Sequence, residues 1–350
     1  MERDALDSLA AQNAQRRSEQ METKRPTNPA AEEILGQYFP VLDHGFVSLV
    51  DYMGSDDSIE RAARVSYGYG TRRASQTRGL IRYLRRHRHT TPSEMVELKF
   101  HCAMPMFVAR QWIRHRTANV NEYSGRYSLM PLLFYTPRPD DFALQSKQNN
   151  QGRSTEAADR GLYHEAAARW ERMRADAAGT YGWLVAEDVA REIARIELPL
   201  STYTQWYWKI DLHNLLHFLT LRVDPHAQLE IRVFAEVMAG MVKRVAPHSY
   251  EAWIDYDVAG GHFSRADLAA LRSLLTVSDD SLRARDGAAL DMNGLATHGL
   301  SAREARELLA KLHARATPDY ELDPALMKAP EEIEARMSAA VPKIDRQPAE

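Results

Sequence analysis

The sequence predicts an α+β fold, a single domain with a mainly antiparallel sheet flanked by helices and with an extension at each end. Two segments carry the strand signal. From Val96 to Met104, apolar residues alternate with mostly polar ones, which is the period of two that a half-buried strand needs. The aromatic segment TYTQWYWKI, residues 202–210, is a second strand candidate between two helical patterns. Because strands and helices do not alternate in βαβ units, and no GxGxxG motif follows a strand, we expect no Rossmann nucleotide site.

Further elements follow from apolar periodicity and from capping residues. The run Gly45 to Met53 is apolar enough for a buried strand, and Asp56 or Asp57 is a plausible cap for the short helix that follows. Pro105 suits the first turn of the helix PMFVARQWIRHR, because its missing N–H would lack a partner there anyway. The other expected elements are helices at Ser58 to Ser66, Thr77 to Arg88, Thr155 to Ala177, Trp183 to Ile196, Leu212 to Arg222 and Ala227 to Val245, a loop and strand at Asn119 to Pro131, and a polar stretch at 136–153 that is an ordered active-site loop or a disordered lid.

The chain divides into three segments by composition. Residues 1–30 are polar and lack a helical apolar stripe, so we expect a disordered extension there. Residues 31–275 contain the strands and most of the helices, and we expect them to form the main domain. Residues 276–350 contain Tyr320 as their only aromatic residue. We expect them to form a helical or partly disordered appendage, with one helix at Ser301 to Ala316.

Charge and cysteine content exclude several classes of protein. The net charge of -3 arises from 45 basic and 48 acidic side chains, so no global field attracts the chain to nucleic acid or to a membrane surface. No stretch approaches the roughly 18 apolar residues of a spanning helix, and the first 20 residues lack the apolar core of a signal peptide. The single cysteine, Cys102, cannot form an intramolecular disulfide. We therefore expect a cytoplasmic location, without membrane or nucleic-acid partners.

Most of the charged and polar side chains that could bind a ligand lie in and after the helix expected to begin at Pro105. Arg110 and Arg114 share a helix face and Gln111 lies beside it, so guanidinium groups and an amide project together. Guanidinium forks suit phosphates and the edges of pyrimidines. The alternative is a solvated basic helix face, which composition alone favours.

The string RHRTANVNEYSGR changes this balance, because it resembles the signature of flavin-dependent thymidylate synthases: Arg-His-Arg, seven residues, then Ser, and Arg two residues further on. Other blocks are similar to that family, in the same order and over about residues 35–260. They are AARVSYG around Ser66, the segment from His89 through Thr91 and Pro92 to Glu94, AREIARIELP with Arg195, and LHNLLHFLTLRVDPHAQLEIR with His213, His217 and Arg222. The family often has Asn and Arg where this chain has Asp211 and His213.

The resemblance implies a catalytic domain at 31–275 that makes dTMP from dUMP with FAD, with NADPH and methylene-tetrahydrofolate as cosubstrates. It also implies a homotetramer whose sites are shared between subunits. The implied dUMP site consists of Gln111, Arg114, Glu122, Ser124, Gly125, Arg126, Arg195 and Arg222. The implied FAD site consists of Thr91, Arg114, His115, Arg116, Glu122, Asp211, His213 and His217, with Ser66 and Glu94 as weaker candidates. The ends of the chain have no counterpart in the family's core.

Several roles have competing interpretations. Arg222 is the candidate for the key catalytic residue, where a guanidinium at the uracil edge would stabilise negative charge, but it could also pair with Asp224 or Glu230. Cys102 lies among strand apolar residues, which argues against the thiolate of conventional thymidylate synthases. His213 and His217 mimic a metal pair, yet no third ligand is obvious, and we expect no metal.

Two other functions stay open at this point. A FAD/NADPH oxidoreductase that acts on a nucleotide without methyl transfer would need the same flavin site. A nucleic-acid-binding module could use the basic segments Arg82 to His89 and Arg110 to Arg116.

Overall fold

The computed structural model describes residues 22–66, 77–147, 152–277 and 318–342 continuously, and residues 11, 15, 18–19, 282–284, 292–298, 302, 305–306 and 308 besides. The chain forms two compact units. The first contains Met1–Tyr250 and Tyr320–Glu350, and the second contains Glu251–Asp319. Within the described part, no helix is long and apolar enough to cross a membrane.

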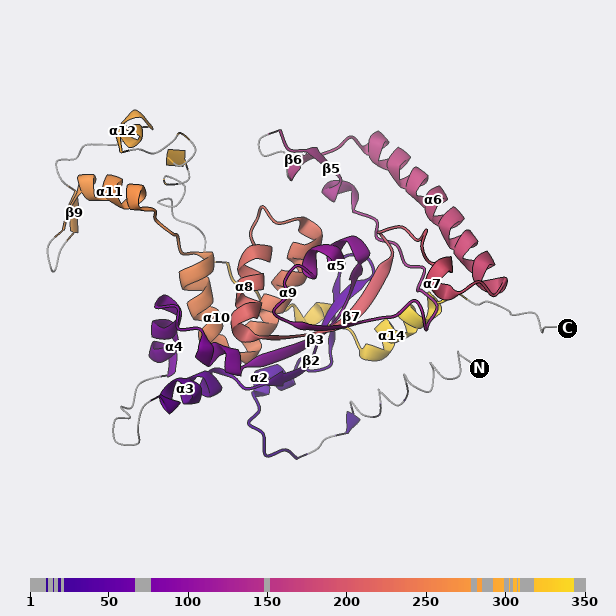
Figure 1. Ribbon diagram of the computed structural model, residues 1–350, viewed down its shortest axis with the longest axis horizontal. Coiled ribbons are helices and arrows are strands. Elements are labelled where there is room, and N and C mark those ends of the chain that lie inside the picture. Colours follow the sequence, from indigo (N-terminus) through magenta and orange to yellow (C-terminus); the bar gives the residue numbers. More distant parts are fainter. Residues whose placement is uncertain are drawn as a thin grey trace. The chain divides into compact units, whose positions relative to one another are not determined.

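The first unit is built on a five-stranded antiparallel sheet in the order β1-β2-β3-β7-β4 (Figure 1). This confirms the expected α+β class with an antiparallel sheet. The strands are β1 (Tyr38–Val41), β2 (Gly45–Met53), β3 (Glu97–Pro105), β7 (Tyr203–Asp211) and β4 (Asn119–Glu122). The predicted strand at Gly45 to Met53 is confirmed at both ends, and the strands predicted at 96–104 and 202–210 are each displaced by one residue. The segment 119–131, expected to hold a loop and a strand, begins with β4.

The alternation in β3 separates a buried face of the sheet from a more polar one. Leu98, Phe100 and Cys102 are fully buried, whereas Lys99 and His101 are only partly covered. Helices α5 (Met106–Trp112), α8 (Leu212–Arg222) and α9 (Leu229–Val245) lie over the sheet (Figure 1). The prediction that Cys102 lies on the apolar face is therefore confirmed.

Helix α8 has the predicted bounds, but α5 is shorter than expected. It ends at Trp112, whose ring is fully buried and stacks on Phe218 with 5.1 Å between centroids. Ile113 is the C-cap, and the polar residues from Arg114 onward lie outside the helix. Pro105 is also not in the first turn, because it is the last residue of β3 and the N-cap of α5.

Between β2 and β3 in the chain, the predicted cap of one helix and the predicted end of the next are wrong. Ser55, not Asp56 or Asp57, is the N-cap of α3 (Asp56–Val65). The Asp56 carboxylate is buried instead, where it accepts hydrogen bonds from the backbone N–H groups of His248 and Ser249 at 2.7 and 3.0 Å. Helix α4 (Thr77–Arg86) begins as predicted and ends two residues early.

The helices predicted at Thr155 to Ala177 and Trp183 to Ile196 are rearranged. One long helix, α6 (Arg160–Ala186), runs through the expected break, and only the short α7 (Arg191–Ala194) follows. Asp159 sets the start of α6, because its side chain accepts a hydrogen bond from the Leu162 N–H at 3.1 Å. Within the polar stretch at 136–153, the structure has a 3-10 turn, η2 (Pro139–Asp141), and β5 (Ala143–Gln145), which pairs with β6 (Arg153–Ala157).

The remaining elements belong to the two units as follows. The first unit also has α2 (Pro29–Glu32), the 3-10 turns η1 (Thr91–Met95) and η4 (Pro324–Leu326), and α14 (Pro330–Ala339). Helix α10 (Pro247–Trp253) begins in the first unit and ends in the second. The second unit has η3 (Ile254–Val258), α11 (Arg265–Leu274), β8 (Leu275–Val277), β9 (Leu282–Ala284) and α12 (Met292–Thr297). Most of the helix expected at Ser301 to Ala316 lies outside the described residues, and the boundaries at 30 and 276 stay predictions.

Candidate functional site

The Arg-His-Arg segment is placed by the aromatic core. Trp112 contacts Trp206 and Trp208 edge to face, with centroids 5.5 and 5.3 Å apart, and stacks on Phe218 of α8. The chain then turns, and the His115 N–H donates to the Trp112 carbonyl at 3.0 Å. As a result, His115 stays half-buried beside α8, while Arg114 and Arg116 are exposed.

His115 and Arg222 form a pair at the edge of this core. The Arg222 Nε donates a hydrogen bond to His115 Nε2 at 3.1 Å, and the His115 ring meets Phe218 edge-on at 4.8 Å. Burial, followed by the charges of Arg222 and His217, lowers the pKa of His115 to about 4. The imidazole is therefore neutral at pH 7, as an acceptor must be.

The alternative ion pairs for Arg222 are not formed in this structure. Asp224 accepts hydrogen bonds from the backbone and ring nitrogens of His226, both at 2.8 Å. Glu230 accepts two bonds from Arg153 at 2.6 Å and one from the Tyr135 hydroxyl at 3.0 Å. Arg222 has no carboxylate partner among the described residues, and burial lowers its pKa.

The start of α8 carries three of the candidate flavin residues. Asp211 is the N-cap, and its two carboxylate oxygens accept from the backbone and side-chain nitrogens of Asn214 at 3.0 and 2.7 Å. His213 presents a buried Nδ1 that has no hydrogen-bond partner in the described part of the chain. His217 is exposed, with its ring 6.5 Å from that of His115.

Turn η1 brings Thr91 to the same side of the molecule, because η1 packs against α8 and β7. The Thr90 hydroxyl donates to the Glu94 carboxylate at 3.2 Å, and Thr91 itself is exposed. Ser66, the other weaker candidate, is the exposed C-cap of α3.

A second group of candidates surrounds the loop at 123–130. Gly125 is buried, and a Cβ atom built there would lie 2.5 Å from Met130 Sδ and 3.1 Å from Arg195 Cδ. The structure thus brings Gly125 and Arg195 together, and only glycine fits without displacing them. Arg126 pairs with the exposed Glu192 at 2.9 Å, and its N–H donates to the Ser124 hydroxyl at 3.3 Å.

Two candidates are held by partners that sequence reasoning did not anticipate. Glu122, on the exposed strand β4, accepts a hydrogen bond from the buried Thr204 hydroxyl at 2.7 Å. The Gln111 amide donates to the side chain of Gln228, the N-cap of α9. Phe218 was also missed, although its place four residues before Arg222 sets both on one helix face.

Neither a cysteine nucleophile nor a metal site emerges from the described residues. Cys102 is completely buried, and burial raises the pKa of its thiol well above the ordinary value. A thiolate is the reactive species, so this protonated thiol is unreactive at neutral pH. No group of three His, Cys, Asp or Glu residues in the described part could hold a metal ion.

Comparison with known proteins gives the family. Residues 48–248 match the family described as thymidylate synthase complementing protein. A flavin-dependent thymidylate synthase from Ruegeria pomeroyi is 49% identical over 309 residues, covering 86% of this chain and 96% of that protein. The one from Gluconobacter oxydans is 52% identical over 262 residues, covering 74% and 86%.

A solved structure agrees with the sequence comparison. The UMP/dUMP methylase PolB from Streptomyces cacaoi, crystallised with 5-Br dUMP, superposes with a TM-score of 0.57 at 32% identity. The match covers 62% of this chain and 97% of that one. The chain belongs to the family of flavin-dependent thymidylate synthases.

Proposed function

We propose that this chain methylates dUMP to dTMP at a site in which Arg222, oriented by His115, lies against the uracil edge. Membership of the family implies FAD as the cofactor and methylene-tetrahydrofolate as the carbon donor. The observation that carries the residue assignment is the hydrogen bond from Arg222 Nε to His115 Nε2. It uses one donor, restricts the orientation of the guanidinium and leaves both terminal amino groups for a ligand.

The Arg222 fork would act on the charge that develops in the pyrimidine. A guanidinium facing N3 and a carbonyl oxygen stabilises negative charge there, which makes C5 of the ring a better nucleophile. No protein nucleophile is needed in this scheme. The buried Cys102 thiol and its raised pKa support that choice.

We propose that the loop at 123–130 binds the phosphate of the nucleotide. Ser124 supplies a hydroxyl, and Arg126 and Arg195 supply guanidinium groups. Gly125 has no side chain, so Met130 and the Arg195 side chain can pack directly against the loop backbone. Gln111, Arg114 and Glu122 complete the proposed dUMP site, as the family motif implies.

The proposed FAD site comprises Thr91, the segment Arg114 to Arg116, Glu122, and Asp211, His213 and His217 on α8. The residues present fit the cofactor, because the orphan Nδ1 of His213 is a buried polar atom that a flavin could satisfy. Bound FAD would supply the hydride chemistry, while the protein binds and orients the reactants. Both carboxylate oxygens of Asp211 accept hydrogen bonds from Asn214, but a carboxylate has further lone pairs that can accept from a ligand.

Three further features belong to the proposal. The reductant of the flavin is NADPH, and the location is the cytoplasm. The active form is a homotetramer, in which the Arg222 group of one subunit and the Ser124 loop of another build one site. The resemblance to the family, whose sites form between subunits, supports this arrangement.

The test is nicotinamide oxidation by the FAD-loaded protein, measured together with dTMP. We expect NADPH oxidation to be accompanied by formation of dTMP. The formation of dTMP should require both dUMP and methylene-tetrahydrofolate. An oxidoreductase without methyl transfer would consume NADPH and leave dUMP unchanged, and that result would overturn the proposal. Protein that fails to bind FAD in titration would do so as well.

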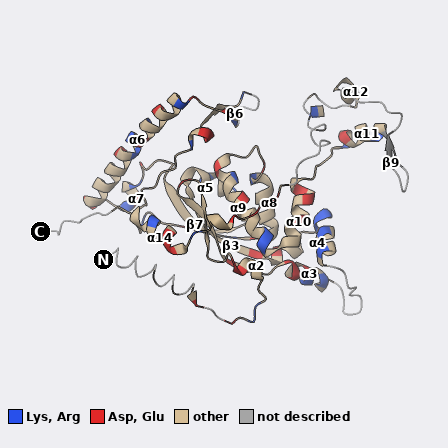
Figure 2. Cartoon of the chain, turned by 180° about the vertical axis from the view of Figure 1, so that it is seen from behind, with Lys and Arg blue, Asp and Glu red and all other residues tan. Residues whose placement is uncertain are grey.

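The nucleic-acid alternative has a separate signature. Figure 2 shows Lys and Arg positions in blue along α4, which carries the first part of the segment Arg82 to His89, one of the two basic segments this alternative would use. Binding through phosphate contacts weakens steeply with added salt and needs no flavin. We expect no such binding by the FAD-loaded protein at physiological ionic strength.

A further inference from the structure

The C-terminal part of the chain docks on the first unit. Residues 320–342, here called the C-terminal strap, begin beside α9, where a Cβ on Gly240 would lie 3.0 Å from Leu322 Cγ. Further along, the Lys328 N–H donates to the Tyr38 carbonyl at 3.0 Å, which forms an antiparallel bridge with edge strand β1. The strap therefore covers the edge of the sheet.

Helix α14 anchors the strap through one apolar face. Ile333 is 3% exposed and packs with Tyr38, Phe46 and Ala103, while Met337, one turn later, packs against the same cluster. Arg336 Nη2 donates to the His44 carbonyl at 2.9 Å. Both kinds of contact fix α14 on the turn between β1 and β2.

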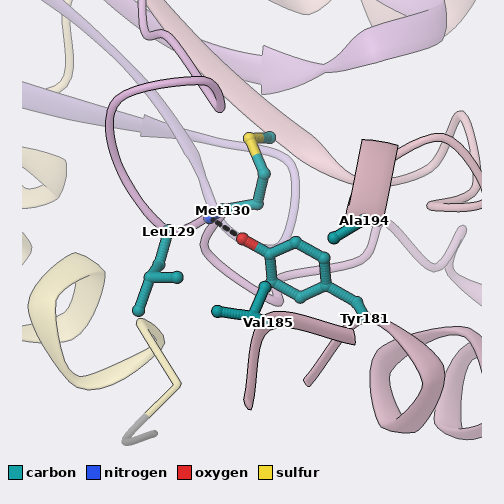
Figure 3. Packing of buried hydrophobic residues seen from close by; sticks show 5 residues of the cluster. All are labelled: Leu129, Met130, Tyr181, Val185 and Ala194. Carbon is teal, nitrogen blue, oxygen red and sulfur yellow. Dashed lines mark hydrogen bonds between the residues drawn. The ribbon is translucent and has the colours of Figure 1, made fainter. Parts of the chain in front are cut away.

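The end of the strap reaches the base of the proposed dUMP loop. The Ala340 carbonyl accepts a hydrogen bond from the Leu132 N–H at 3.1 Å. Val341 packs against the cluster of Leu129, Met130, Tyr181, Val185 and Ala194, which Figure 3 shows beside the end of the strap. The strap thus contributes a side chain and a backbone acceptor to the support of this loop.

The same cluster determines where Gly125 sits. The Met130 N–H donates to the Tyr181 hydroxyl at 2.9 Å, a bond drawn in Figure 3. The Met130 sulfur lies against Gly125, 2.5 Å from the position that a Cβ atom would take. A shift of Leu129 and Met130 would therefore move Gly125 and its neighbours Ser124 and Arg126.

We propose that the C-terminal strap positions the dUMP-binding loop, with Ile333 as its anchor and Val341 as the positioning residue under the loop. The inference rests on the proposed function, which assigns the loop at 123–130 to dUMP. Loss of the strap contacts would lower the fraction of molecules in which the loop has its binding shape, and the apparent affinity for dUMP falls with that fraction. The reacting groups would be unaffected once dUMP is bound.

The experiment compares full-length, FAD-loaded variants. Val341→Ser removes the apolar contact, Val341→Ile preserves it, and Ile333→Asp undocks α14. Leu326→Asp is the matched control, because this strap residue is 56% exposed. Equilibrium titration gives the Kd of dUMP, steady-state kinetics give kcat and KM, and hydrogen exchange reports on peptides covering 123–132.

For Val341→Ser, we expect the Kd and KM of dUMP to rise roughly tenfold. The variant should retain its FAD content, and its kcat at saturating dUMP should stay close to the parent value. Amide exchange at 123–132 should accelerate. Val341→Ile and Leu326→Asp should match the parent, and Ile333→Asp should reproduce Val341→Ser if it folds. If it does not fold, Val341→Ser decides alone.

Two results would overturn the inference. One is an unchanged Kd for dUMP in Val341→Ser, and the other is an equal loss of FAD and dUMP affinity, which would indicate general destabilisation. Ser124→Ala separates this failure from failure of the proposed function. If Ser124→Ala weakens dUMP binding and the strap variants do not, only the strap inference is wrong. If Ser124→Ala has no effect, the assignment of the loop is wrong and the strap inference falls with it.

Discussion

Arg222 Nε and His115 Nε2 lie 3.1 Å apart, in a hydrogen bond that joins the last turn of α8 to the chain just after α5. Because Nε2 accepts, the neutral imidazole carries its proton on Nδ1. The two residues are 107 positions apart in the sequence, and they meet where Trp112 and His115 both pack on Phe218. His115 is therefore as much a support of Arg222 as a candidate flavin contact.

Replacing His115 should impair Arg222 indirectly. His115→Ala removes the acceptor, and we expect turnover to fall about tenfold, the effect of roughly one hydrogen bond. His115→Gln should recover part of this loss, since its amide oxygen can occupy the position of Nε2. Turnover is measured at saturating FAD with equal bound flavin. Equal, parental rates in both variants would show that the contact does not orient Arg222.

Acid should destabilise the fold through His101 as well as His115. His101 Nε2 lies 2.9 Å from Gln205 Oε1, and burial lowers the pKa of His101 to about 4, against an opposing effect of that hydrogen bond. An unfolded histidine takes up a proton near pH 6.5. Stability is therefore fully present above about pH 6.5 and is lost as the pH falls toward 4.

Urea unfolding between pH 7 and 4.5 measures this effect. A single histidine contributes a slope of at most about 1.4 kcal/mol per pH unit. In the parent, the free energy of unfolding should fall as the pH is lowered. In His101→Gln, this fall should be shallower. A variant with the same slope as the parent would show that His101 is not kept neutral by the fold.

Cys102→Ser should leave dTMP formation largely intact. The thiol behaves as a small buried apolar group, so the cost should appear in stability, at roughly 1–3 kcal/mol for burying a hydroxyl without a partner. Cys102→Ala serves as the control without a polar group. Thermal unfolding and dTMP formation are measured on both. A folded, flavin-loaded Cys102→Ser protein without activity would restore the thiolate mechanism.

The pair Arg153 and Glu230 should matter for stability. Burial would raise the pKa of Glu230, but the hydrogen bonds and charge of Arg153 outweigh it and hold that pKa below the ordinary value. Arg153→Ala leaves a buried carboxylate without its cation, which we expect to cost roughly 2–4 kcal/mol.

The matched control is Arg160→Ala. Arg160 pairs with Asp140 at 3.3 Å, but both side chains are mostly exposed, and such pairs contribute about 0–1 kcal/mol. Urea titration at pH 7 compares the two variants. Equal losses of stability would contradict the special role of the buried pair.

Local patterns predicted the elements whose apolar spacing is strong. The bounds of β2 and α8 agree with the expected ones, because their apolar residues are continuous or periodic. The end of α5 was wrong, since burial of Trp112 determines it and no local signal marks that event. Asp56 was misassigned because a tertiary partner, the backbone at residues 248–249, competes with the local cap.

The site was predictable only where a motif identifies it. The spacing of Arg110 and Arg114 predicts only a basic helix face. The roles of the individual residues follow from the family motif. Pairings such as Arg222 with His115 depend on tertiary packing and carry no local signal. The docking of α14 was missed for a related reason: it rests on two apolar residues, Ile333 and Met337, in an otherwise polar helix.

The central claim is that Arg222 stabilises the charge that develops on the pyrimidine. We expect Arg222→Ala to lower the rate by about 100-fold or more, the usual scale for removing one preorganised donor. FAD should remain bound. Arg222→Lys should recover little, because a point charge lacks the planar fork.

The most direct test is single-turnover formation of dTMP by enzyme whose flavin has been reduced beforehand, mixed with dUMP and methylene-tetrahydrofolate. Parent and variants are matched in folding and FAD content, so that only the reaction of bound substrates is compared. The account predicts dTMP formation in the parent and a loss of about 100-fold in both Arg222→Ala and Arg222→Lys. Near-parental rates in both variants would contradict it and transfer the charge-stabilising role to Arg195 or Arg126.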